Sequence, residues 1–120
     1  PPMSYIEGFV IPVPTAKKDE YRAFAEMTVP YFRKHGAERI VETWAEDVPD
    51  GEVTSFPMAV QLQPEESVVF SWIIWPDKAT RDGAYEKIMA DMEADGQSHN
   101  SPPFDGKRMI FGGFEPLVEG

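Results

Sequence analysis

Glu42 is the residue whose surroundings best suit chemistry. It lies in the segment 40–44 (IVETW), where side chains in an extended strand alternate and Glu42 shares a face with Ile40 and Trp44. A carboxylate among large apolar groups acquires a raised pKa and can serve as a general base. The alternative is a structural ion pair with one of three cations: Arg39, Lys107 or Arg108.

Other polar and aromatic residues are predicted to converge with Glu42 on the face of the sheet that carries no helices. Arg108 and His35 are the further catalytic candidates, and the ligand-binding candidates are Glu7, Trp44, Ser71 and Trp72. Tryptophans can line a cavity for a flat ligand. The alternative for the aromatic residues is a place in the core or in a dimer interface.

Both histidines also have ordinary explanations. His35 ends the run 33–36 (RKHG), where a cation is favourable at the negative end of a helix dipole. His99 lies in the polar segment 95–103, either as an exposed loop residue or as part of a lid over a site.

Several kinds of site are not indicated. The chain has no cysteine and only two histidines, which are far apart in sequence, so neither a cysteine- or histidine-based metal site nor a cofactor is predicted, and a carboxylate-rich oxygen site stays open as an alternative. The acidic turn 47–52 does not have the ligand spacing of an EF-hand. No arrangement typical of a serine or cysteine nucleophile is present, and Gly112-Gly113 does not open a helix as a phosphate loop does.

Charge and hydropathy restrict the partners. The 120 residues carry a formal net charge of −10, which argues against nucleic acid and anionic membranes. No apolar run reaches the roughly 18 to 20 residues of a membrane span, and no signal peptide is seen, so a cytoplasmic location is expected. We expect one domain over residues 3–116, with Pro1-Pro2 left over from cloning ahead of Met3.

Four segments rich in β-branched and aromatic residues are predicted to form strands: 4–13, 37–48, 67–75 and 107–115. Pro12 and Pro14 are expected to end the first strand. The third is nearly continuous in apolar residues, which predicts burial on both faces. Within the fourth, Gly112-Gly113 leaves a gap that another group could approach closely, as at a bulge or a tight contact.

Helical spacing predicts a first helix from Thr15, as N-cap, to Gly36, with either a kink or a separate final turn at Pro30. Its apolar positions are Tyr21, Phe24, Ala25, Met27 and Phe32. A second helix is predicted from the N-cap Asp77 to about Asp95. Its apolar stripe is Ala84, Ile88, Met89 and Met92, and its exposed side carries Arg81, Glu86, Lys87 and Glu93. Segment 54–63 is left open between a short helix and an extra strand.

The order strand, helix, strand, repeated once, predicts an α+β fold of the ferredoxin-like βαββαβ type, with a four-stranded antiparallel sheet and two helices on one face. The predicted strands carry more large aromatic residues than one face can bury against helices. They are Trp44, Phe70, Trp72, Trp75, Phe111 and Phe114. Pairing with a second copy would cover the other face, which predicts a homodimeric α/β barrel.

Four blocks in order give the chain a resemblance to the bacterial YbaA-like family, a family of unknown function. They are 8–10 (GFV), 39–51 (RIVETWAEDVPDG), 69–73 (VFSWI) and 104–115 (FDGKRMIFGGFE). The resemblance covers Met3 to about Glu115 and implies the ferredoxin-like, dimeric α/β-barrel fold. It brings no catalytic residues with it.

Two functions are compatible with these observations. The first is a homodimer that binds or transforms a small apolar or aromatic molecule in a cavity of the sheet. The alternative is a non-catalytic dimeric module, structural or accessory to a stress response, whose aromatic face serves assembly alone.

Overall fold

The computed structural model describes residues 4–120, so the interpretation of Pro1-Pro2 lies outside the described residues. The four strands are β1 (Tyr5–Pro14), β2 (Arg39–Trp44), β3 (Glu66–Trp75) and β4 (Ile110–Phe114). They form one antiparallel sheet in the order β2-β3-β1-β4. This is the ferredoxin-like arrangement, and the predicted α+β fold is confirmed.

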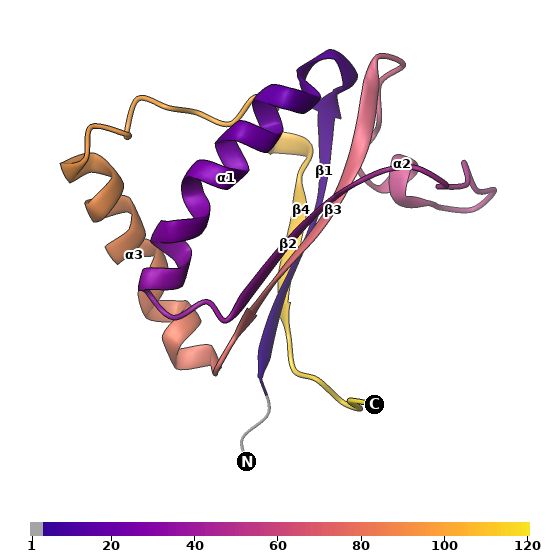
Figure 1. Cartoon of the computed structure of the whole chain (residues 1–120). Helices are drawn as coiled ribbons and strands as arrows, with labels where there is room; N and C mark the ends of the chain where they lie inside the picture. Colours follow the sequence, from indigo (N-terminus) through magenta and orange to yellow (C-terminus); the bar gives the residue numbers. More distant parts are fainter. Residues whose placement is uncertain (1–3) are drawn as a thin grey trace.

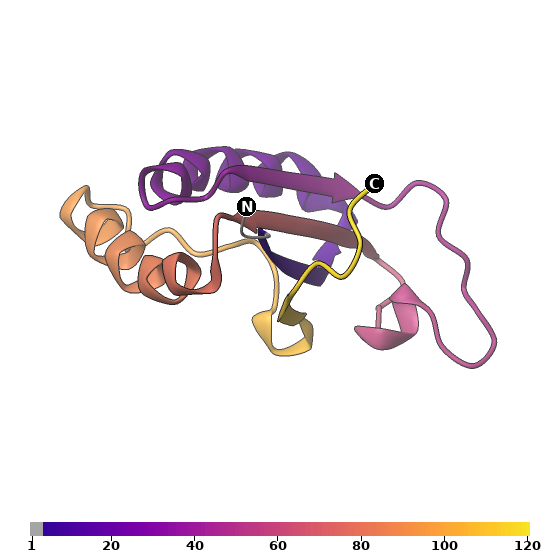
Figure 2. The same cartoon turned by 90° about the horizontal axis from the view of Figure 1, so that it is seen from below.

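Two long helices, α1 (Lys18–Lys34) and α3 (Lys78–Ala94), cover one face of the sheet. The short α2 (Phe56–Ala59) lies on the opposite side, beside one end of the sheet (Figures 1 and 2). Two short 3₁₀ helices complete the chain, η1 (Thr15–Lys17) and η2 (Gly106–Arg108). The open segment 54–63 is thus a helix, which Ser55 caps by accepting a hydrogen bond from the Met58 amide at 3.1 Å.

The core lies between the sheet and the two long helices. Trp75, Val69 and Val13 from the strands are fully buried there, and Ala84 and Ile88 of α3 pack against the sheet. Asp77 caps α3 as predicted, accepting a hydrogen bond from the Thr80 amide at 2.7 Å. Met89, predicted to be in the apolar stripe, is mostly exposed instead.

Several predicted boundaries are wrong. Pro12 and Pro14 lie inside β1. Strand β4 pairs only with Ile6–Val10, so both prolines lie beyond its end, where a missing amide interrupts no hydrogen bond to β4. Strand β2 ends at Trp44, since the proline- and glycine-containing segment that follows leaves the sheet. Strand β4 begins only after the η2 turn.

Helix α1 also departs from expectation at its start. Thr15 does not cap it: its hydroxyl is 2.7 Å from that of Ser67, and the helix starts at Lys18 without a side-chain cap. Helix α1 continues through Pro30 to Lys34, so no separate final turn forms there.

Strand β3 is not buried on both faces. Its residues Val69, Ser71, Ile73 and Trp75 point to the helices and are buried. On the other face Phe70 is 43% exposed, and α2 covers only the end near Val68 through Val60. In the single chain, the sheet therefore has one covered face and one that is open and partly aromatic.

Candidate functional site

Strand register decides which side chains share the helix-covered face. Glu42 of β2 stands opposite Ser71 of β3, and Ser71 stands opposite Phe9 of β1. Glu7 stands opposite Ile73, which is two residues from Ser71 and on the same face. Directly opposed residues point to the same side of a sheet, so Glu7, Glu42 and Ser71 all face the helices. Trp44, opposite the buried Val69, faces them too.

The sequence-based placement of these residues on the helix-free face is therefore wrong. Alternation along a strand shows which residues share a face, but not which face the helices cover. Trp72 is adjacent to Ser71 and points to the open face, where its ring lies 5.5 Å from that of Phe70. It does not join the other candidates.

Arg108 and His35 are bound elsewhere in the fold. Arg108 donates to both carboxylate oxygens of Glu66, at 2.7 and 2.6 Å, and this pair links η2 to the start of β3. His35 Nε2 lies 2.6 Å from Asp91 Oδ2, joining the end of α1 to α3. The ion-pair alternative for Glu42 is not what the structure contains, because Arg108 pairs with Glu66 instead.

Glu42 has a partner that the sequence reading missed. The hydroxyl of Tyr21, on α1, donates a hydrogen bond of 2.6 Å to Glu42 Oε1, and Ser71 stands opposite Glu42 in the strand register, on the same face. Tyr21 and Ala25, one turn apart, are the buried residues of α1 and face the sheet. The helical spacing identified Tyr21 as a core residue, but its hydroxyl reaches the carboxylate as well.

Two cavities meet at this pair of residues. The outer cavity, about 340 Å³, opens between the first half of α1 and β2. Its lining includes Lys18, Tyr21, Arg22, Ala25, Val29, Ile40, Glu42 and Trp44. The inner cavity, about 180 Å³, lies deeper between α1 and the sheet and includes Phe9, Tyr21, Phe24, Ala25, Ile40, Glu42, Ser71 and Phe104. Glu42 and Tyr21 belong to both linings.

The electrostatics of the pair favour proton acceptance by Glu42. Glu42 is an exposed residue of β2 in the single chain, but the protein packed around its carboxylate on the helix side raises its pKa, and the hydrogen bonds from Tyr21 and Ser71 oppose this rise. Burial, together with the charge of Glu42, also raises the pKa of Tyr21 well above that of a free phenol. Tyr21 therefore remains a hydrogen-bond donor, while Glu42 stays accessible to solvent through the outer cavity.

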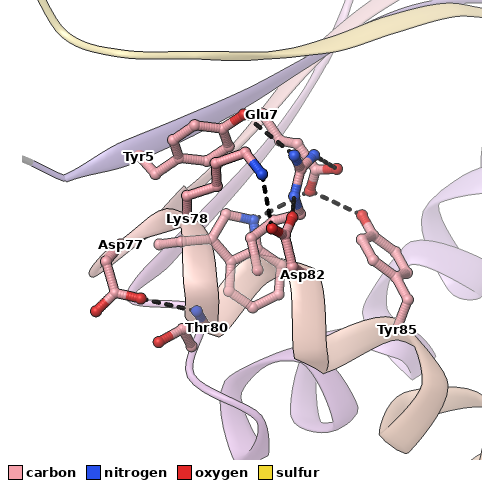
Figure 3. A network of polar contacts seen from close by, with 9 residues as sticks. Tyr5, Glu7, Asp77, Lys78, Thr80, Asp82 and Tyr85 are labelled. Carbon is pink, nitrogen blue, oxygen red and sulfur yellow. Dashed lines mark hydrogen bonds and ion pairs between the residues drawn. The ribbon is translucent and has the colours of Figure 1, made fainter.

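Glu7 belongs to a second polar group, shown in Figure 3. It is 3% exposed and accepts three hydrogen bonds: from Trp75 Nε1 at 3.0 Å, Tyr85 Oη at 2.8 Å and Arg81 Nη1 at 3.1 Å. Arg81 also donates to Tyr5 Oη at 3.1 Å and lies over the Tyr5 ring. The Glu7 carboxylate is thus paired and hydrogen-bonded within the protein, which is what a buried structural charge requires.

Arg81 and Tyr85 were not predicted in this role. Arg81 was placed on the exposed side of its helix, yet it turns toward β1 because Glu7 is there to pair with it. Arg81 and Tyr85 are one helical turn apart on α3, and that spacing was the signal in the sequence that the two side chains share a face of the helix. Glu7 also lines a cavity of about 430 Å³ beside β4, but its oxygens are already engaged.

Within residues 4–120, no cluster of three or more histidine or acidic side chains is arranged to hold a metal ion. No helix in that range combines the length and the apolar character needed to cross a membrane.

Comparison with known proteins identifies relatives of the whole chain. A family model described as "Protein of unknown function (DUF1428)" matches residues 4–106. The uncharacterised protein YbaA of Escherichia coli strain K12 is 54% identical over 119 residues, covering 98% of this chain and 99% of the relative. YbaA of Shigella flexneri matches to the same extent. The resemblance proposed from the four sequence blocks is confirmed.

Solved structures support the fold at much lower identity. A dimeric ferredoxin-like protein from an uncultured marine organism superimposes with a TM-score of 0.59 at 8% identity, covering 98% of this chain and 99% of the other. A protein of unknown function from Nitrosomonas europaea gives a TM-score of 0.51 at 12% identity, with coverages of 98% and 93%. At these identities the likeness concerns the fold alone.

Proposed function

This chain belongs to the DUF1428 family, whose description assigns no activity, and we propose that it binds a small, largely apolar molecule in the cavities around Glu42. In this proposal Glu42 accepts a proton from a hydroxyl, N–H or activated C–H group of the ligand. Tyr21 and Ser71 hold the carboxylate in place.

The observation that carries the proposal is the position of Glu42. A carboxylate whose pKa is raised by burial, but which remains accessible through a cavity, combines basicity with access for a ligand. Glu7 provides the contrast within the same face, because its carboxylate is closed in by three donors. Of these two carboxylates, Glu42 is the one suited to exchange a proton with a bound molecule.

The walls of the cavities support an apolar ligand. Ala25, Val29, Ile40 and the Trp44 ring surround the route to Glu42. The outer cavity, about 340 Å³, falls at the small end of the range in which proteins bind small molecules, roughly 300 to 1,000 Å³. The ligand is accordingly small, with one flat or apolar part against these residues and one polar group at Glu42.

Proton transfer at this site has clear roles for its neighbours. The ionised carboxylate takes the proton, and the conjugate base of the ligand is left beside two hydroxyl groups. Tyr21 stays protonated because its own pKa is raised, so its O–H can stabilise negative charge on Glu42 before transfer. Once Glu42 is neutral, the Ser71 and Tyr21 hydroxyls are free to stabilise the charge on the ligand.

Native mass spectrometry of freshly purified protein tests the binding. A reproducible additional mass, lost in Glu42→Gln and retained in Glu38→Gln, is the expected result. Glu38 is exposed immediately before β2 and lines none of the cavities described, so it matches the charge change without touching the site. Loss of the mass in both variants, or in neither, would contradict the assignment to Glu42.

The proposed assembly is a homodimer formed through the open face of the sheet. Phe70, Ile110 and Phe114 are 43%, 44% and 60% exposed on that face, an apolar area that favours a partner. The similarity to a structure described as a dimeric ferredoxin-like protein supports this choice of partner. We expect light scattering to give the mass of a dimer and Phe70→Glu to give a monomer. A monomeric parent protein would refute the assembly.

The same exposed face favours the second candidate function, a non-catalytic dimeric module. Under that alternative, Glu42→Gln changes stability only, and the purified dimer carries no additional mass. The mass measurement therefore separates the two functions, because only the first requires a molecule bound at Glu42.

A further inference from the structure

The mouth of the outer cavity carries positive charge. Lys18 and Arg22, on the first turns of α1, both belong to its lining. Arg22 is already paired, with Nη1 2.9 Å from Asp19 Oδ1. Within residues 4–120, no carboxylate oxygen lies within 4.0 Å of the Lys18 ammonium group, although the chain carries a net charge of −10. Lys18 is thus a cation at a cavity mouth with no ionic partner of its own.

The position of Lys18 is tied to the aromatic wall. Its Nζ lies 5.5 Å from the centre of the Trp44 ring, within the distance at which a cation is attracted to an aromatic face. The contact holds the ammonium group beside the surface against which an apolar ligand would pack. The Trp44 ring also lies 6.4 Å from that of Tyr21, so the aromatic wall leads from Lys18 toward Glu42.

The cavity therefore has two different charged ends. One has Lys18 and Arg22 of α1, and the other has Glu42, an exposed residue of β2, with the buried Tyr21 beside it. Glu26 is the remaining charged residue of the lining, and it is exposed to solvent. Between the two ends the wall consists of apolar side chains and the Trp44 ring.

We propose that the ligand is a small organic anion whose carboxylate binds Lys18 and whose proton-donating group reaches Glu42. This inference rests on the proposed function. The middle part of the ligand is flat and packs against Trp44. A carboxylate at Lys18 makes a charge-assisted hydrogen bond, and it converts a cation held only by an aromatic ring into a paired one. An aromatic hydroxy acid is the simplest molecule with these three parts.

The test uses three probes and two-dimensional NMR of ¹⁵N-labelled protein, following the indole N–H of Trp44 during titration. The probes are 4-hydroxyphenylacetate, its methyl ester and phenylacetate. The ester removes the negative charge and keeps the hydroxyl, and phenylacetate removes the hydroxyl and keeps the charge. Each probe is titrated into the parent protein and into Lys18→Gln, Lys17→Gln and Glu42→Gln.

Lys17→Gln is the matched control. Lys17 is the neighbouring, exposed lysine, it does not line the cavity, and it makes no side-chain cap on α1. We expect the free acid to bind roughly fivefold more tightly than its ester, the scale of one moderately exposed ion pair. Lys18→Gln should remove this advantage, and Lys17→Gln should keep it. Glu42→Gln should weaken 4-hydroxyphenylacetate more than phenylacetate.

Three results would overturn the inference: equal affinities of acid and ester, equal losses in the two lysine variants, or no shift of the Trp44 signal with any probe. Equal binding of acid and ester that still depends on Glu42 would overturn the anionic ligand and leave the proposed function standing. If binding depended on Lys18 but not on Glu42, the proposed function would be overturned and the anionic ligand would stand.

Discussion

Gly113→Ala should destabilise the protein because Tyr5 occupies the space of the missing side chain. A Cβ atom at Gly113 would overlap Tyr5 Oη and would lie 2.6 Å from Cζ and 2.7 Å from Cε2. Tyr5 cannot move freely, since its hydroxyl accepts a hydrogen bond from Arg81 and the guanidinium group lies 4.9 Å from the ring centre. Gly112 differs: its Cβ would meet the Phe114 ring at 3.5 and 3.6 Å, an ordinary contact.

Three contributions determine how much Gly113→Ala changes the free energy of unfolding. Forcing extra atoms into a packed site costs about 1 to 3 kcal/mol. Displacing Tyr5 from Arg81 adds roughly 0.5 to 1.5 kcal/mol for the lost hydrogen bond. Replacing glycine by alanine in a strand returns roughly 0.5 to 1 kcal/mol of backbone entropy. The net effect on the free energy of unfolding is a loss of about 2 kcal/mol for Gly113→Ala and a gain of roughly 0.5 to 1 kcal/mol for Gly112→Ala.

Urea unfolding, followed by circular dichroism, measures both variants. A second pair in a Tyr5→Ala background completes the cycle, in which Gly113→Ala should cost less than about 0.5 kcal/mol because the clash is gone. Light scattering on each variant controls for assembly, since Gly112 lies on the face proposed to pair. The predicted role of Tyr5 is refuted if Gly113→Ala costs no more stability than Gly112→Ala, or if its cost persists in the Tyr5→Ala background. In either case the contact with Tyr5 would not be the cause of the lost stability.

Three further predictions concern the two carboxylates. Carboxyl ¹³C NMR should show Glu42 titrating above an ordinary glutamate, and Tyr21→Phe should raise the pKa further, because the Tyr21 hydrogen bond lowers it; a fall would contradict this account. Since the folded-state pKa is raised, the stability due to Glu42 is complete below its unfolded value of about 4.3 and is lost as pH rises through the folded value. Thermal unfolding should therefore show Glu42→Gln gaining stability relative to the parent between pH 4 and pH 7, and a constant difference would refute the shift. Glu7→Gln should cost about 3 kcal/mol in urea unfolding, because it leaves the Arg81 charge poorly compensated, and a loss below about 1 kcal/mol would show that the pair is not structural.

The fold could be predicted because its signals are local. Segment 67–75 has the β-branched and aromatic composition of a central strand, and Asp77 before an apolar stripe marks the start of α3. The errors fall where tertiary contacts decide. Pro12 looks like a strand terminator in the sequence, but the end of β4 pairing at Val10 makes room for it. Thr15 looks like a helix cap, but it bonds to Ser67 of a strand 52 residues away.

The site was harder to predict than the fold. Glu42 with Ile40 and Trp44 on one face follows from alternation, and the structure agrees. Which face the helices cover depends on how the chain crosses between strands, and alternation contains no such information. Tyr21 was counted only as apolar, because a helical repeat registers its ring and not its hydroxyl. Arg81 was assigned to solvent for the corresponding reason, since its buried partner Glu7 is 74 residues away.

The aromatic residues on the two faces of the sheet differ in burial and in hydrogen bonding. On the helix side, Trp75 is completely buried and satisfies its N–H through Glu7, while Trp44 borders a cavity. On the open side, Phe70 and Phe114 have no polar group to satisfy and remain exposed. Chemistry and assembly are thus proposed for opposite faces of one sheet. A change on the open face can then alter assembly without reaching Glu42 directly, because the backbone of the sheet lies between them.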